Sequence, residues 1–115
     1  MFDKALLIAS TESELNSLAL VIILATSTIR EKRKDPWQAA EISYLTALMA
    51  HEKKSAEPKF DNIRALLMQD AAAVEPVLKE VWSSNDEAFR KSILNSLSMR
   101  VIELCEYQNR FLGVV

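Results

Sequence analysis

The stretch DPWQAAEISYLTALMAHE, residues 35–52, decides the fold class of this chain. Asp35 can cap a helix N-terminus, and Pro36 suits the first helical position, where a backbone N–H has no partner within the helix. Apolar residues then recur three or four positions apart on two faces of the predicted helix. One face carries Trp37, Ala40, Tyr44, Ala47, Leu48 and His51, and the other carries Ile42, Leu45 and Met49. A helix that is apolar on two sides is usually central in a bundle, so we expect this helix in the core, with Trp37 buried.

Upstream, a helix is predicted to begin near STESEL, residues 10–15. Thr11 can serve as the N-cap, and Glu14 lies where the acid of a capping box belongs. The inner face of this helix carries Leu15, Leu18, Ala19, Ile22, Ile23 and Ile29. The opposite face carries Leu20, Val21 and Leu24. We therefore expect the helix to be buried on most sides at mid-length.

Downstream, three more helices follow from the punctuation of the chain. A short helix is expected over residues 60–69, and Pro76 is expected to interrupt or restart the pattern, giving a fourth helix through Trp82. Ser84 or Asn85 can cap the last and longest helix. Its apolar positions are Phe89, Ile93, Leu97, Val101, Leu104 and Phe111, interrupted by Gln108. The sequence thus predicts an all-α fold, a compact bundle of about five to six helices in a single domain over residues 1–115.

The composition excludes several classes of function. The chain contains one glycine, Gly113, so it cannot build a phosphate-binding loop, a dinucleotide fingerprint or a fold rich in β-hairpins. The net charge of −2 means that any nucleic-acid site must be local. A single cysteine, Cys105, cannot form an internal disulfide, and the longest apolar run, residues 18–25, is far shorter than a membrane span. Because the N-terminus also lacks the features of a signal peptide, we expect a cytoplasmic location.

Catalytic and metal-binding groups are not evident in the sequence. His51 is the only histidine, and no metal-ligating residue lies one helical turn before it, so it is expected at the polar end of its helix. Cys105 follows Leu104 on the last helix and is expected to act as a small apolar core residue. We predict no catalytic residue, no metal site and no cofactor, and the chain is not expected to be an enzyme on its own.

Carboxylate pairs have simple structural explanations. Glu103 and Glu106 share a helix with Arg100 and Arg110, a pattern typical of an exposed surface with alternating charges. Carboxylates in the first turns of helices favour the helix dipole without any catalytic task.

The basic run REKRK leaves two interpretations open. Arg30, Lys32, Arg33 and Lys34 lie within five positions, directly before the central helix. Cations at the end of a helix satisfy its dipole, and a charged run is often only a solvated connector. Alternatively, a basic stretch can follow the backbone of single-stranded DNA. These four residues are the candidate contacts for nucleic acid or a protein partner.

Four segments resemble, in the same order, the all-α domain of the TraG-like coupling ATPases of bacterial conjugation. In that family a DPFW…AA…LL.AL segment opens the main helix, and residues 35–37, 39–40 and 45–48 of this chain match it. The segments SELNSLALVIILAT (13–26), PKFDNIRALLMQ (58–69) and RKSILNSLSMRVIEL (90–104) are similar to the family's other helices. The resemblance covers residues 11 to 112. The family's Phe-Trp pair is a single Trp37 here, and the Walker motifs are absent.

The resemblance implies a substrate-recognition domain that is part of a larger, hexameric, membrane-anchored ATPase of the type IV secretion system. Its partners would be a relaxase or another secreted protein, and single-stranded DNA bound weakly. The isolated chain is expected to be a monomer. Two other functions stay open: a free-standing helical DNA-binding regulator, and a secretion adaptor or chaperone that dimerises through an apolar face.

Overall fold

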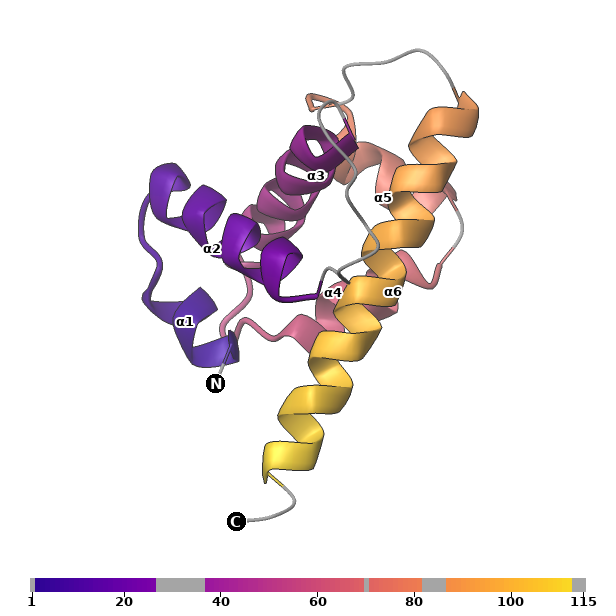
Figure 1. Cartoon of the computed structure of the whole chain (residues 1–115). Helices are drawn as coiled ribbons and strands as arrows, with labels where there is room; N and C mark the ends of the chain where they lie inside the picture. Colours follow the sequence, from indigo (N-terminus) through magenta and orange to yellow (C-terminus); the bar gives the residue numbers. More distant parts are fainter. Residues whose placement is uncertain (1, 27–36, 70, 82–86, 113–115) are drawn as a thin grey trace.

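The computed structural model describes residues 2–26, 37–69, 71–81 and 87–112. These residues form six helices and no strand: α1 (Phe2–Ile8), α2 (Glu12–Ala25), α3 (Trp37–Glu52), α4 (Phe60–Leu67), α5 (Ala71–Leu78) and α6 (Glu87–Leu112). The Cα radius of gyration is 13.6 Å, close to the roughly 13 Å typical of a compact domain of about 100 residues. The predicted all-α bundle is therefore confirmed, with its helices arranged as in Figure 1.

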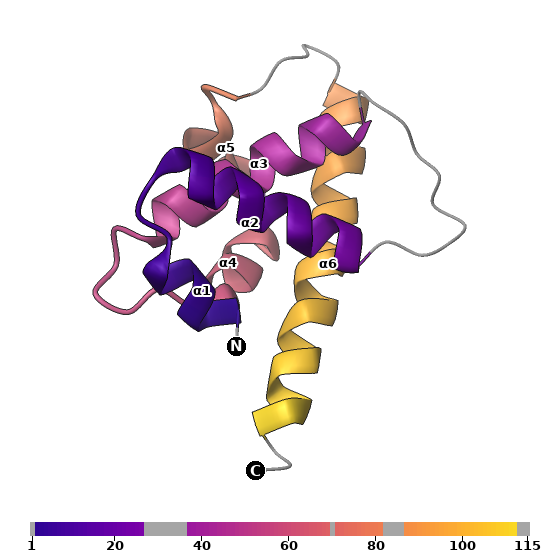
Figure 2. The ribbon, with the colours of Figure 1, turned by 60° about the vertical axis from the view of Figure 1, so that its left-hand side comes forward.

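Helix α3 is the centre of the bundle, as its sequence predicts. It packs against α2, α4, α5 and α6, and Figures 1 and 2 show it behind α2. Tyr44, Leu45, Leu48 and Met49 are fully buried on its two apolar faces. His51 is exposed in the last turn, as expected. The predicted cap, Asp35 with Pro36, and the side chain of Trp37 lie outside the described part.

Helix α2 begins where the capping pattern predicts. The Glu14 N–H donates to Thr11 Oγ1 over 3.1 Å, while the Glu14 carboxylate accepts from the N–H of Ser10 at 3.0 Å. One N–H group in the first turn of the helix and one just before its N-cap thereby gain partners. On the inner face, the four core side chains are Leu15, Ala19, Ile22 and Ile23.

The expectation that α2 is buried on most sides is wrong. Leu20, Val21 and Leu24 are 40%, 54% and 57% exposed. The reason is the position of α2 on the outside of the bundle, where its main partners are α3 and α1. Helical periodicity indicates which residues are apolar, but it does not show whether a neighbouring element covers them.

Helix α1 precedes the predicted first helix and has no counterpart in the sequence-based expectation. Its Leu6 side chain is fully buried. The helix N-terminus is capped from the other end of the chain, because Gln108 Oε1 accepts from the N–H groups of Phe2 (2.8 Å) and Asp3 (3.1 Å). A cap supplied from so distant a position leaves no local pattern at residues 2–8.

The remaining helices need one further correction. Pro76 lies inside α5, which starts five residues before it. A proline removes one helical hydrogen bond, but Val74 and Leu78 are buried, and the packing of α5 on α3 holds the helix. In α6, the predicted positions Ile93, Leu97, Val101 and Leu104 are buried. Trp82, Ser84, Asn85, Ile29 and the side chain of Phe111 lie outside the described part. Among the described helices, none has the length and apolarity needed to cross a bilayer.

Candidate functional site

The predicted contact residues Arg30, Lys32, Arg33 and Lys34 lie outside the described residues, so their geometry stays a prediction. The described chain reaches Thr26 on one side of them and resumes at Trp37 on the other. The structure therefore places the residues on either side of the segment 27–36.

A buried ion pair joins Arg100 of α6 to Glu41 of α3, near the two ends of this segment. The position of Arg100 differs from the one predicted from the sequence. Arg100 was expected on a charged surface with Glu103 and Glu106, but only 7% of it is exposed. Its Nε donates to Glu41 Oε2 over 2.6 Å, and Glu41 is 1% exposed. The hydroxyl of Ser96 donates to the same carboxylate oxygen at 3.0 Å. The carboxylate of α3 is thus held by two side chains of α6.

The same guanidinium also reaches the end of α2. Arg100 Nη1 donates to the carbonyl of Ile23 and to Thr26 Oγ1, each at 3.2 Å. The Thr26 hydroxyl in turn donates to the carbonyl of Ile22 at 2.8 Å. Carbonyls in the last turn of a helix have no partner within the helix, and a cation there favours the helix dipole. Arg100 therefore caps α2 while it is paired with α3.

The sequence does contain a signal for this pair. The charges of Glu103, Glu106 and Arg110 on the same helix favoured a surface position for Arg100 and hid that signal. Arg100 lies three residues after Leu97 and four before Leu104, and is therefore on the inner stripe of α6. Glu41 likewise lies four residues before Leu45, on an apolar stripe of α3. Two opposite charges on two core-facing stripes would have predicted a buried pair.

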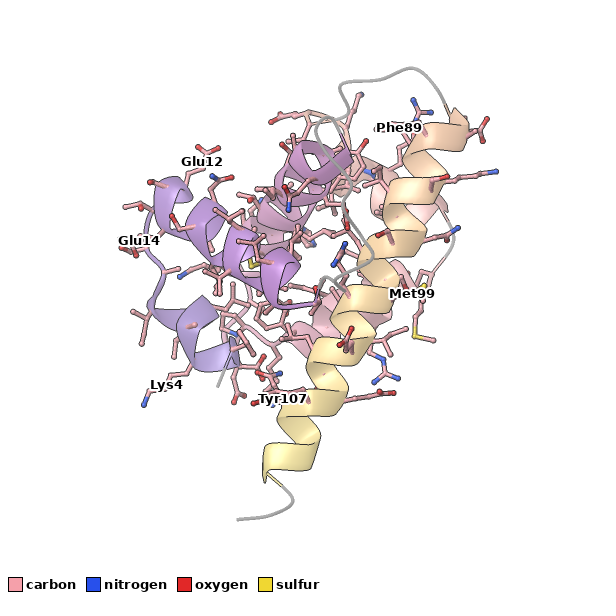
Figure 3. The ribbon with its side chains drawn as sticks, viewed as in Figure 1. Lys4, Glu12, Glu14, Phe89, Met99 and Tyr107 are labelled. Carbon is pink, nitrogen blue, oxygen red and sulfur yellow. The ribbon has the colours of Figure 1, made fainter. Side chains whose placement is uncertain are left out.

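A second candidate is an exposed apolar face on α1 and α2. These two helices lie together on one side of the bundle (Figures 1 and 2). They carry five of the eight large apolar side chains that are exposed among the described residues: Leu7, Ile8, Leu20, Val21 and Leu24. We call these five residues the α1–α2 apolar face. Figure 3 shows Lys4 of α1 and Glu12 and Glu14 of α2 on the side of the bundle where these helices lie, whereas Met99 projects from α6 on the opposite side.

An open groove of about 780 Å³ lies between the N-terminal part of α2, the middle of α3 and the end of α5. Its lining on α3 includes the small side chains of Ser43, Ala47 and Ala50 together with Thr46 and His51. Lys79 and Glu80, in the turn that follows α5, also line the groove. With cations and carboxylates both present, the charge of this groove favours neither an anionic nor a cationic ligand.

The core contains two titratable groups whose chemistry is altered by burial. Burial raises the pKa of the Cys105 thiol to about 12, and the nearby Asp61 carboxylate contributes in the same direction. Cys105 is 1% exposed, as predicted for a core residue. Burial also raises the pKa of Tyr44, and the charge of Arg90 opposes this shift in part. The Tyr44 hydroxyl has no hydrogen-bond partner among the described residues.

Within residues 2–26, 37–69, 71–81 and 87–112, no three metal-ligating side chains gather at one point. Comparisons with protein-family models, with curated proteins and with solved structures gave no match.

Proposed function

We propose that this chain is the substrate-recognition domain of a type IV coupling protein in bacterial conjugation. It would receive a relaxase–DNA complex or another secreted protein for delivery to the secretion channel. The four-segment resemblance supports the family, and the α1–α2 apolar face is the observation that supports a binding function. Large apolar side chains exposed on a soluble protein can form an interaction site, and five of them on two adjacent helices would suit a protein partner.

In this proposal the domain works in the cytoplasm as part of a larger, hexameric and membrane-anchored ATPase, without a cofactor or chemistry of its own. Single-stranded DNA would contact Arg30, Lys32, Arg33 and Lys34 through its phosphates. With a net charge of −2, the isolated chain would bind DNA more weakly than about micromolar at physiological salt, and added salt would weaken the binding further.

The basic run is tested by changing Arg30, Lys32, Arg33 and Lys34 together to Ala. We expect conjugative transfer to fall at least about tenfold. Binding to a fluorescent 30-nucleotide oligo(dT) should be lost at low salt, because a chain with fewer cations releases fewer counterions from the DNA when it binds. The melting temperature should change little, since a charged connector contributes little packing.

A matched control removes the same number of charges from exposed lysines elsewhere: Lys54, Lys59, Lys79 and Lys91. This control should retain most of the transfer and most of the oligo(dT) binding. Equal losses in the two variants would show a general charge effect, and an unchanged transfer frequency in the first variant would exclude its contact role.

The α1–α2 apolar face also favours a second candidate, a secretion adaptor that dimerises by burying this face against another copy. An adaptor would be an obligate dimer, whereas the recognition domain is expected to be a monomer. The mass measured by light scattering separates the two.

A further inference from the structure

We propose that Arg100 and Glu41 form a positioning pair that holds together the two ends of the segment 27–36, which joins α2 to α3. Only the consequence for binding depends on the proposed function, because this segment carries the candidate contact residues. The positioning itself follows from the described geometry.

One guanidinium reaches in two directions. Its Nε and Nη2 donate to the two carboxylate oxygens of Glu41, at 2.6 Å and 3.5 Å. Glu41 lies only four residues after Trp37, where the chain resumes beyond the segment. On the other side, Nη1 donates to Ile23 and Thr26 in the last turn of α2, at 3.2 Å. Thr26 is the last described residue before the segment, so Arg100 joins that end to the second turn of α3.

The anchor for both contacts is α6. Ser96 lies one turn before Arg100, and its hydroxyl donates to Glu41 at 3.0 Å, which orients the carboxylate toward the guanidinium. Around Arg100, the buried residues Leu97, Val101 and Leu104 fix α6 in the core. The groups that hold the flanks of the segment are therefore fixed to the buried stripe of α6.

Stability alone is a weak explanation for such a pair. Removing two charges from water is costly, and replacement of a buried ion pair by apolar residues is often neutral or stabilising. A forked guanidinium is directional, however, and fixes the relative position of the groups that it binds. Apolar contacts between α2 and α3 would permit small shifts that the hydrogen bonds of Arg100 prevent.

The direct test measures the distance between spin labels at the two ends of the segment, using Ala25→Cys and Ala39→Cys. Both alanines are exposed, and the buried Cys105 is replaced by Ala in every sample. With Arg100 and Glu41 present, pulsed dipolar spectroscopy should give one narrow distance distribution. Changing Arg100→Met together with Glu41→Met, which leaves no unpaired buried charge, should at least double its width while circular dichroism retains the helical signal.

A milder variant keeps the test decisive if the double substitution disturbs folding. Thr26→Val removes the hydroxyl that Arg100 contacts but leaves the ion pair intact, and we expect a smaller broadening from it. If the distribution stays narrow in the folded variants, the positioning role is wrong.

Binding to the oligo(dT) separates this inference from the proposed function. The Arg100→Met, Glu41→Met variant should bind at least about threefold more weakly than the unsubstituted chain. If it broadens the distance distribution but binds normally, while the four-alanine variant of the basic run does not bind, the pair does not position the contact residues. If the four-alanine variant binds normally, the contact role fails, and the distance distribution alone decides whether the pair positions the segment.

Discussion

Burial in the C-terminal half of α6 keeps the Cys105 thiol protonated. Its pKa is raised to about 12, first by burial and then by the Asp61 carboxylate. The thiol of a cysteine in an unfolded chain has a pKa of about 8.5. The unfolded chain therefore loses its thiol proton before the folded chain does. The stabilisation that results is fully present below the unfolded pKa and is lost as the pH rises toward 12.

At the residue scale, we therefore predict that Cys105→Ala makes the alkaline loss of stability less steep. The free energy of unfolding, measured by urea denaturation between pH 7 and 10.5, should fall more with pH in the unsubstituted chain than in the variant. Tyr44 contributes in the same direction in both proteins, so the difference isolates the thiol. Parallel pH profiles would contradict the prediction. Under native conditions at pH 8, Cys105 should react with an aromatic disulfide reagent only as fast as the surrounding helices open and expose it to solvent.

Among the elements, the short helices are held by side chains from distant positions. Lys53 Nζ donates to the carbonyls of Leu6, Leu7 and Ala9 at the C-terminal end of α1. The Asp3 carboxylate accepts from the N–H of Phe60 at the start of α4, at 2.8 Å. Isolated helices of seven or eight residues are marginal in water. These caps therefore have a large share in deciding whether α1 and α4 form.

At the element scale, we predict that Gln108→Met releases α1. The substitution keeps a side chain of similar length but removes the oxygen that accepts from Phe2 and Asp3. The loss should be about 1–2 kcal/mol, and hydrogen exchange should accelerate in residues 2–8 before it does in α3. Glu106→Gln, an exposed position on the same helix, is the control and should leave exchange unchanged. If residues 2–8 exchange as slowly in the Gln108→Met variant as in the unsubstituted chain, the cap contributes little.

The whole molecule has two unlike sides. Helices α1 and α2, which carry the α1–α2 apolar face, lie on one side, and Met99 projects from α6 on the other (Figure 3). Met99 is 72% exposed, so it provides an apolar control that lies away from the proposed binding surface.

At this scale, the proposed function predicts that Leu20→Gln, Val21→Thr and Leu24→Gln together weaken binding to the proposed partner, a relaxase, by at least about tenfold. Their side chains are exposed, so the melting temperature should shift by only a few degrees. Met99→Gln should leave the affinity unchanged, and equal losses would exclude a specific role for the face. Light scattering should give the mass of a monomer for the unsubstituted chain. A dimer that the triple variant dissociates would favour the adaptor instead.

The features that the sequence predicts well are those that depend on neighbours in the chain. The Thr11 cap is separated by three residues from its donor, and the stripes of α3 follow from periodicity alone. The missed features depend on distant contacts: α1 requires Gln108, and the position of Arg100 requires Glu41 on another helix. The exposure of Leu20 was mispredicted because its neighbours in space, rather than its neighbours in sequence, decide its burial.

The hydrogen bonds from Phe2 and Asp3 to Gln108 have a consequence for the architecture of larger proteins. They place the beginning of the described chain against the last turns of its final helix, so that a polypeptide entering and leaving the bundle does so at neighbouring points. Domains whose ends are adjacent can be inserted into a surface loop of another domain without separating the loop's two strands of chain. This bundle therefore has the geometry of a domain that a host protein can carry as an insertion.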